Sequence, residues 1–155
     1  MQTSPQLILA LFQPDIPQNA GTLLRTCACL SVGAAIVEPA GFPVTDRHFR
    51  RAGMDYLDQV NIDRHVSFAA FEDWRRAGGR RLVLLTTRAA TPYTDFAFRA
   101  EDVLMVGRES AGAPEEVHAA ADARLIVPIK PGLRSLNVAV AAAMVLGEAL
   151  RQTGG

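Results

Sequence analysis

Short apolar runs alternate along the chain with segments whose apolar residues recur at helical spacing. The runs are bounded by proline, glycine or polar residues, which is typical of strands buried on both faces. We expect strands over residues 7–12, 34–38, 82–86, 103–106 and 125–129, with 60–62 as a further candidate. We expect helices over residues 19–31, 68–77, 114–121 and 135–152, and a short basic helix or turn over 46–53. This alternation predicts an α/β fold: a mostly parallel sheet, covered by helices on both faces, in a single domain spanning residues 1–155.

Polar residues mark the starts of two of these helices. Asn19 is a suitable N-cap for the first helix, with Pro17 two positions before it. Ser135 is a suitable N-cap for the last, because such side chains accept bonds from free backbone N–H groups. Asn137 opens a run that is otherwise apolar. A buried amide needs partners, so Asn137 either belongs to a site or satisfies a nearby loop carbonyl.

The carboxyl ends of the predicted strands lead into unusually long loops. These cover residues 13–19, 87–94, 107–112 and 128–135, and three of the four are rich in glycine, proline and polar residues. Parallel sheets bind ligands outside the carboxyl ends of their strands. The sequence therefore predicts a site built from several loops at one edge of the sheet.

Composition narrows the class of protein. The chain has 155 residues, 49% apolar and 21% charged, which is the balance of one globular domain. We see no run of about 20 apolar residues and no signal peptide, so we expect no membrane partner. Cys27 and Cys29 are two positions apart on a predicted helix, which suits neither a mutual disulfide nor a metal pair. We therefore expect a cytoplasmic protein.

Charge gives a weaker signal. Sixteen basic residues balance sixteen acidic ones, so no net field attracts a polyanion. Lys130 is the only lysine, and the other basic residues are arginine, the better phosphate ligand. This bias indicates either phosphate recognition or a GC-rich genome. The histidines are scattered without metal-ligand spacing, so we expect no metal site.

Two further segments have two interpretations each. The start of the first helix presents free N–H groups and Arg25, which would bind an anion, or it is an ordinary capped helix whose Arg25 pairs with a surface carboxylate. Gly107, Glu109 and Gly112 follow a buried strand, at a spacing that fits neither a dinucleotide fingerprint nor a P-loop. They either admit a ligand close to the backbone or form a tight turn with a solvated Glu109.

Together these segments resemble the SPOUT class of RNA methyltransferases. Within that class the chain is most similar to the small tRNA (cytidine/uridine) 2'-O-methyltransferase family that modifies the wobble nucleotide. The family's P-x-N-x-G-x-x-x-R, G-x-E-x-x-G and I-P-x-x-P-x-x-R-S-x-N motifs are met in order, with Val127 for the first Ile, and its R-R-A-G-[LM]-D-Y stretch is complete. The matching residues are Pro17, Asn19, Gly21 and Arg25; Gly107, Glu109 and Gly112; Pro128, Pro131, Arg134, Ser135 and Asn137; and Arg50–Tyr56.

The resemblance implies a fold, a cofactor and a reaction. The C-terminal part would form a deep trefoil knot that binds S-adenosyl-L-methionine, the donor of a methyl group to a ribose 2'-OH. It implies a cofactor pocket formed by Leu85, Gly107, Val127, Ile129, Ser135 and Leu136. It implies a catalytic set of Arg25, Asn19, Glu109, Ser135 and Asn137, in which we interpret Arg25 as a clamp for developing negative charge rather than a base, because arginine stays protonated.

The resemblance also implies partners. The substrate would be tRNA, contacted by Arg50, Arg51 and Arg134, and the active site would be completed across a homodimer, consistent with a last helix that is apolar over most of its circumference. The alternative for these arginines is a solvated basic turn, and for the helix a fully internal position in a monomer. Two other functions stay open: a methyltransferase of the same fold acting on another RNA site, and a non-catalytic RNA- or nucleotide-binding module.

Overall fold

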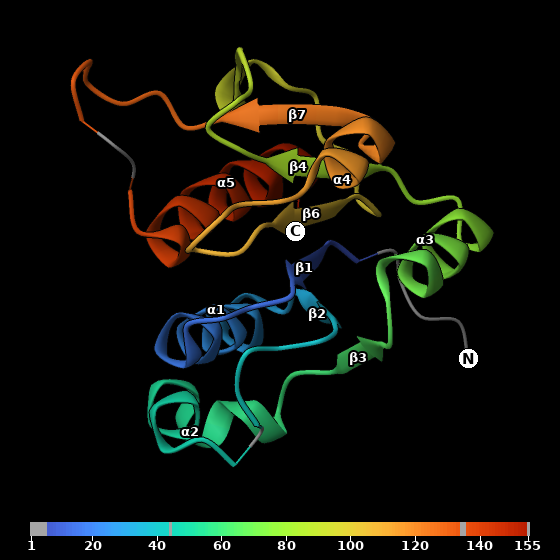
Figure 1. The fold of residues 1–155 in the computed structure, drawn as a ribbon. Helices are drawn as coiled ribbons and strands as arrows, with labels where there is room; N and C mark the ends of the chain where they lie inside the picture. The colour runs from blue at the N-terminus through green and yellow to red at the C-terminus, as the bar shows by residue number, and fades with distance from the viewer. Residues whose placement is uncertain (1–5, 44, 134–135, 155) are drawn as a thin grey trace.

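One parallel sheet organises the protein. The structure, a computed structural model, describes residues 6–43, 45–133 and 136–154. Within these ranges seven strands pair in the order β3-β2-β1-β6-β4-β7-β5, and every pair is parallel (Figure 1). The strands are β1 (Ile8–Phe12), β2 (Gly33–Val37), β3 (Ile62–His65), β4 (Leu82–Leu85), β5 (Thr91–Pro92), β6 (Val103–Val106) and β7 (Ala123–Ile126). The predicted α/β class with a mostly parallel sheet is confirmed.

Helices cover both faces of this sheet. Leu9 and Leu11 of β1 pack in one apolar cluster with α1, α2 and α5, whereas the alternate residue Ala10 packs in a second cluster with α3 and α4. Figure 1 shows α1, α2 and α5 on one side of the sheet and α3 on the other. The α-helices are α1 (Pro17–Leu30), α2 (Arg47–Gly53), α3 (Phe68–Ala77), α4 (Glu115–Ala120) and α5 (Val138–Thr153); η1 (Met54–Asp58) and η2 (Tyr93–Asp95) are 3-10 helices. Strands buried on both sides explain the continuous apolar runs of the sequence.

The strand order reverses between β1 and β6. These two strands are direct neighbours, with Leu11 opposite Val106 at their carboxyl ends. The connection after β1 leads to α1 on one face, and the connection after β6 leads to α4 on the other. Such a switch point opens a crevice between the two connections, which is where α/β sheets bind ligands.

Two predicted helix starts are wrong. Helix α1 begins at Pro17, and its N-cap, Ile16, makes no side-chain cap bond, so Asn19 lies inside the first turn. Proline suits the first helical position because its missing N–H has no partner there. Helix α5 begins at Val138 and is capped by Asn137, whose Oδ1 accepts bonds from the next helical N–H groups, rather than by Ser135, which lies outside the described residues.

The strand predictions are wrong at the outer part of the sheet. The candidate at 60–62 is replaced by β3 at Ile62–His65, the strand expected at 125–129 is β7 at Ala123–Ile126, and β5 was not expected. Arg64 in β3 and Arg124 in β7 are exposed, and these charged residues interrupt the apolar pattern that marks a buried strand. None of the described helices is long and apolar enough to cross a membrane.

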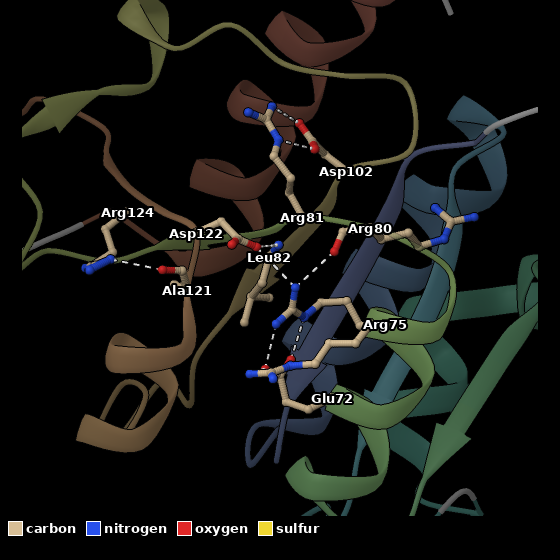
Figure 2. A network of polar contacts seen from close by, with 10 residues as sticks. Glu72, Arg75, Arg80, Arg81, Leu82, Asp102, Ala121, Asp122 and Arg124 are labelled. Carbon is tan, nitrogen blue, oxygen red and sulfur yellow. Dashed lines mark hydrogen bonds and ion pairs between the residues drawn. The ribbon is translucent and has the colours of Figure 1, made fainter.

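Buried charges pair at the amino ends of the central strands. Arg75 of α3 bonds both carboxylate oxygens of Glu72, at 2.5 and 2.6 Å, and reaches Asp122 at 3.1 Å (Figure 2). Arg81, just before β4, bonds both oxygens of Asp102, just before β6, at 2.8 and 2.7 Å. These pairs join α3 to the strand starts and satisfy groups that would be costly to bury alone.

Candidate functional site

A cavity of about 610 Å³ lies at the opposite, carboxyl ends of β4, β6 and β7. That volume is within the range of small-molecule sites, roughly 300 to 1,000 Å³. Its apolar lining includes Leu85, Val106, Val127, Ile129, Leu133 and Leu136, and its polar lining includes Asn19, Thr86, Arg108, Glu109, Lys130 and Asn137. An apolar slot with a few polar groups suits a ligand that has both a flat ring and charged substituents.

Gly107 allows the loop after β6 to fold back on itself. Arg108 and Gly112 form an isolated antiparallel bridge, with N···O distances of 3.2 and 2.7 Å. A Cβ atom on Gly107 would lie 2.5 Å from the backbone nitrogen of Ala113 and 2.6 Å from the carbonyl carbon of Gly112. Any side chain at position 107 would therefore displace the backbone that forms one wall of the cavity.

Two asparagines join distant parts of the chain beside the cavity. The Asn137 side-chain amide donates to Oδ1 of Asn19 at 3.1 Å, although the two residues are 118 positions apart. The other end of the Asn137 amide, Oδ1, accepts from the N–H groups of Ala139 and Val140 at 2.8 and 3.2 Å. Asn137 thus caps α5 and ties it to the first turn of α1, which explains a polar residue at the start of an apolar run.

Glu109 and Asp15 bring two acids together at the switch point. The Glu109 N–H donates to Asp15 Oδ1 at 3.2 Å, and the Ser110 hydroxyl donates to Asp15 Oδ2. Burial, reinforced by the Asp15 carboxyl, raises the pKa of Glu109 to about 7. The hydrogen bond with Glu109 lowers the pKa of Asp15. Two neighbouring acids with pKa values shifted in opposite directions often mark functional sites.

Three of the predicted arginines, Arg25, Arg50 and Arg51, lie on the α1–α2 side of the molecule. Arg25 is exposed on α1, and its guanidinium lies over the Tyr56 ring, 5.3 Å from the ring centre. It is absent from the described residues that line the cavity. Arg50 and Arg51 are exposed on α2, which packs closely against α1 because Gly21 leaves room there: a Cβ atom on Gly21 would lie 2.8 Å from Ala52 Cβ.

A family model described as the SpoU rRNA methylase family matches residues 6–147. This chain belongs to that family. It is 73% identical over 147 residues to a protein of Beijerinckia indica named tRNA (cytidine(34)-2'-O)-methyltransferase, covering 95% of this chain and 92% of that one. It is 35% identical over 150 residues to an Escherichia coli K12 protein of the same name, covering 96% and 94%.

Solved structures agree with the SpoU assignment. A structure concerning the 2-OH methylation of C/U34 on tRNA matches with a TM-score of 0.90 and 39% identity, covering 96% of this chain and 97% of that one. The SpoU methyltransferase AviRb from Streptomyces viridochromogenes, in complex with AdoMet, matches with a TM-score of 0.88 and 28% identity, covering 97% of this chain and 62% of that one.

The structure of this SpoU-family chain brings most of the predicted site residues together. The lining includes Leu85, Gly107, Val127, Ile129 and Leu136 of the predicted cofactor set, and Asn19, Glu109 and Asn137 of the predicted catalytic set. Arg25 lies elsewhere, as described above. Ser135 and Arg134 lie outside the described residues. The roles of all these residues stay predictions.

Sequence reasoning missed several residues of the site. Thr86, Lys130 and Leu133 line the cavity next to predicted residues, and the general rule of loops at carboxyl strand ends covers them. Asp15 belongs to the loop over residues 13–19, which the sequence assigns to the site, but no role is predicted for it. An acid two residues before the first motif's proline was a weak signal, because its partner Glu109 lies 94 positions away. Among the described residues we find no cluster of three or more His, Cys, Asp or Glu side chains that could hold a metal ion.

Proposed function

We propose that this chain is an S-adenosyl-L-methionine-dependent methyltransferase that methylates the ribose 2'-OH of cytidine or uridine 34, the wobble nucleotide of tRNA. The observation that carries the proposal is the single cavity wall formed by all three motif segments, in a chain 73% identical to a protein named for that activity. Three relatives that match across nearly the whole length of the chain carry this name.

The cavity fits the proposed cofactor. Its apolar side, with backbone groups at Leu85, Gly107 and Val127, suits an adenine ring, and its polar residues suit the charged amino acid part. When bound, S-adenosyl-L-methionine supplies an activated methyl group on a positively charged sulfur. The chain's contribution is then to hold donor and ribose in line.

Arg25 is proposed to act on the ribose or its adjacent phosphate. Its guanidinium stays protonated near neutral pH, so it would stabilise developing negative charge rather than remove a proton. Because Arg25 lies outside the cavity of its own chain, we propose that it serves the cavity of a second copy in a homodimer. Exposed apolar side chains support that arrangement: Val140 and Met144 on α5 are 51% and 40% exposed.

The substrate surface is proposed to include Arg50 and Arg51 on α2, together with Arg134 of the third motif. A chain with no net charge must bind RNA through such local patches. The proposal also includes two finer points: a trefoil knot in the C-terminal part, supported by the family resemblance, and a cytoplasmic location, where tRNA is found. Tracing residues 120–155 in an experimental electron density map would test the knot.

The direct test is methyl transfer to tRNA. The purified protein, S-adenosyl-L-methionine carrying a labelled methyl group and tRNA from a strain lacking the protein are expected to give label in tRNA, with mass spectrometry locating it at the 2'-oxygen of nucleotide 34. Label at another nucleotide would favour the alternative that the protein is a methyltransferase of the same fold acting on a different RNA site. Donor binding without any transfer would favour a non-catalytic binding module and contradict the proposal.

Complementation tests the shared active site. Arg25→Ala removes the proposed clamp but leaves the cavity intact, and Gly107→Ala disturbs the cavity but leaves Arg25. Each variant alone is expected to lose about 100-fold or more in turnover. If one site uses residues of both copies, mixing the two variants after partial unfolding restores activity in mixed dimers. Failure to restore it, or a monomer by light scattering, contradicts the dimeric site.

The geometry of the guanidinium is tested by Arg25→Lys. A lysine keeps the charge but not the planar fork, so turnover is expected to fall while tRNA and donor affinities stay close to wild type. Near-normal turnover with normal tRNA affinity would show that the fork does not matter and would contradict the assigned role.

A further inference from the structure

An acid pair joins the two connections that leave the switch point. Asp15 lies in the connection from β1 to α1, and Glu109 in the connection from β6 to α4. The Glu109 N–H and the Ser110 hydroxyl both donate to the Asp15 carboxylate, which places the two carboxyl groups side by side. The pair therefore spans the crevice and connects a cavity wall to the start of α1, where Asn19 lies.

The Glu109 carboxyl lacks the partners that an ionised acid needs. Its Oε2 atom is buried and has no hydrogen-bond partner. Neither nearby cation bonds this oxygen: Arg108 bonds Gln13 Oε1 and the Gly112 carbonyl, both at 3.4 Å, and Lys130 lines the same cavity without reaching Oε2. An unpaired buried carboxylate beside another carboxylate is strongly disfavoured.

A proton on Glu109 would remove both the repulsion between the two carboxylates and the lack of a hydrogen-bond partner. It removes one of two like charges, and it gives the pair a donor for a hydrogen bond between the carboxyl groups. The pKa shifts agree with this picture, since that of Glu109 is raised to about 7 and that of Asp15 is lowered. Asp15 remains the ionised member because it already accepts two donors, the Glu109 N–H and the Ser110 hydroxyl.

We propose that Asp15 is a positioning residue of this site, which holds Glu109 in its neutral form and shares that proton, so that the β1–α1 and β6–α4 connections stay joined around the cavity. The inference rests on the proposed function for its role in methyl transfer. When Glu109 ionises, it faces the Asp15 carboxylate across the crevice, and their repulsion separates the cavity wall from α1. The site thus loses its ordered form as pH rises through neutrality.

Direct titration of the free protein tests the shared proton. With glutamate labelled at the side-chain carboxyl carbon, the NMR signal lost in Glu109→Gln identifies Glu109, and its shift against pH gives the ionisation midpoint. The wild type is expected to titrate near 7. In Asp15→Asn the midpoint falls by about one unit or more, because the like charge is gone and the amide donates to the carboxylate.

Asp73→Asn is the matched control for this titration. It removes one acid of the same type from the exposed surface of α3 and is expected to leave the Glu109 midpoint unchanged. A wild-type midpoint near the ordinary 4.5, or equal midpoints in wild type and Asp15→Asn, overturns the shared proton. Because this measurement needs neither donor nor tRNA, it stands or fails independently of methyl transfer.

Ligand affinity tests the positioning role. Calorimetry with S-adenosylhomocysteine, the product left after methyl transfer, is expected to show several-fold weaker binding to the wild type at pH 8.5 than at pH 6.5. Asp15→Asn binds with a flatter pH dependence, since its amide holds ionised Glu109 in place. Wild-type affinity that does not change with pH, or the same slope in both proteins, overturns the role of Asp15.

Discussion

The two ends of strands β4, β6 and β7 differ in whether their acidic side chains are paired with arginine. At the amino ends, the carboxylates of Glu72, Asp102 and Asp122 each bond an arginine (Figure 2). At the carboxyl ends, Glu109 faces another acid, has an oxygen without a partner and lies beside a cavity.

This difference separates residues that stabilise the fold from residues available to a ligand. Ion pairs that are fully bonded leave nothing for a ligand to satisfy. An unpartnered acid in a crevice keeps its hydrogen-bonding capacity, at a cost in stability that the rest of the fold must offset. The comparison predicts that changes at the amino ends alter the free energy of unfolding and that changes at the carboxyl ends alter ligand binding.

The largest effect on stability is expected from Asp102→Ala. Asp102 is 2% exposed and accepts two bonds from Arg81 and a third from the Arg99 N–H. Its removal leaves the partly buried Arg81 guanidinium without its carboxylate, so the free energy of unfolding should fall by about 3 kcal/mol in urea titrations. Affinity for S-adenosylhomocysteine, measured on the folded variant, should not change. A large loss of affinity at full folding would contradict the separation of the two ends.

Gly107→Ala, at the carboxyl ends of the strands, is expected to change ligand affinity rather than stability. The new methyl group would meet the backbone of Gly112 and Ala113, so the cavity wall must move. We expect at least a tenfold loss in S-adenosylhomocysteine affinity, about 1.4 kcal/mol, by calorimetry. The matched control is Gly147→Ala, because a Cβ atom there meets nothing within 4 Å and alanine favours the interior of α5. If both variants bind equally well, the close backbone approach at Gly107 is not needed for the site.

The sequence predicted the carboxyl-end site better than the outer part of the sheet. Apolar runs located β1, β4 and β6 closely because these strands are buried on both faces. The outer strands β3 and β7 carry Arg64 and Arg124 at exposed positions. These charged residues interrupt the apolar run from which a buried strand is predicted. Motif spacing located the loops that line the cavity, since each loop directly follows a strand and the sheet brings the strand ends together.

Long-range pairing was beyond sequence reasoning. The Asn19–Asn137 bond and the Asp15–Glu109 pair each join residues more than 90 positions apart, and nothing local to either residue identifies its partner. The helix starts failed for a related reason. Asn19 has a good N-cap side chain, but that side chain accepts from Asn137 instead, while Pro17 begins the helix.

Glu109, at the carboxyl ends of the strands, should also make the free energy of unfolding depend on pH. This effect is expected to be smaller than those of Asp102→Ala and Gly107→Ala. Because the pKa of Glu109 is raised from 4.5 to about 7, the folded state holds this proton more tightly than the unfolded chain. Its contribution is complete below pH 4.5 and is lost as pH rises through 7. The difference in unfolding free energy between wild type and Glu109→Gln should therefore fall over that window. His65, whose pKa burial lowers, gives the opposite slope but is common to both proteins and cancels.

The smallest effect is expected from Arg88→Ala, which tests whether burial or the ion pair itself sets the difference between the two ends. Arg88 follows β4 at its carboxyl end and bonds Glu115 at 2.8 Å, about the same distance as in the Arg81–Asp102 pair, but its side chain is 57% exposed and that of Glu115 is 77% exposed. Water and salt screen such a pair, so the urea midpoint should stay within error of wild type. A loss as large as that of Asp102→Ala would mean that arginine–carboxylate pairs stabilise this fold wherever they occur, and the contrast between the strand ends would then rest on Glu109 alone.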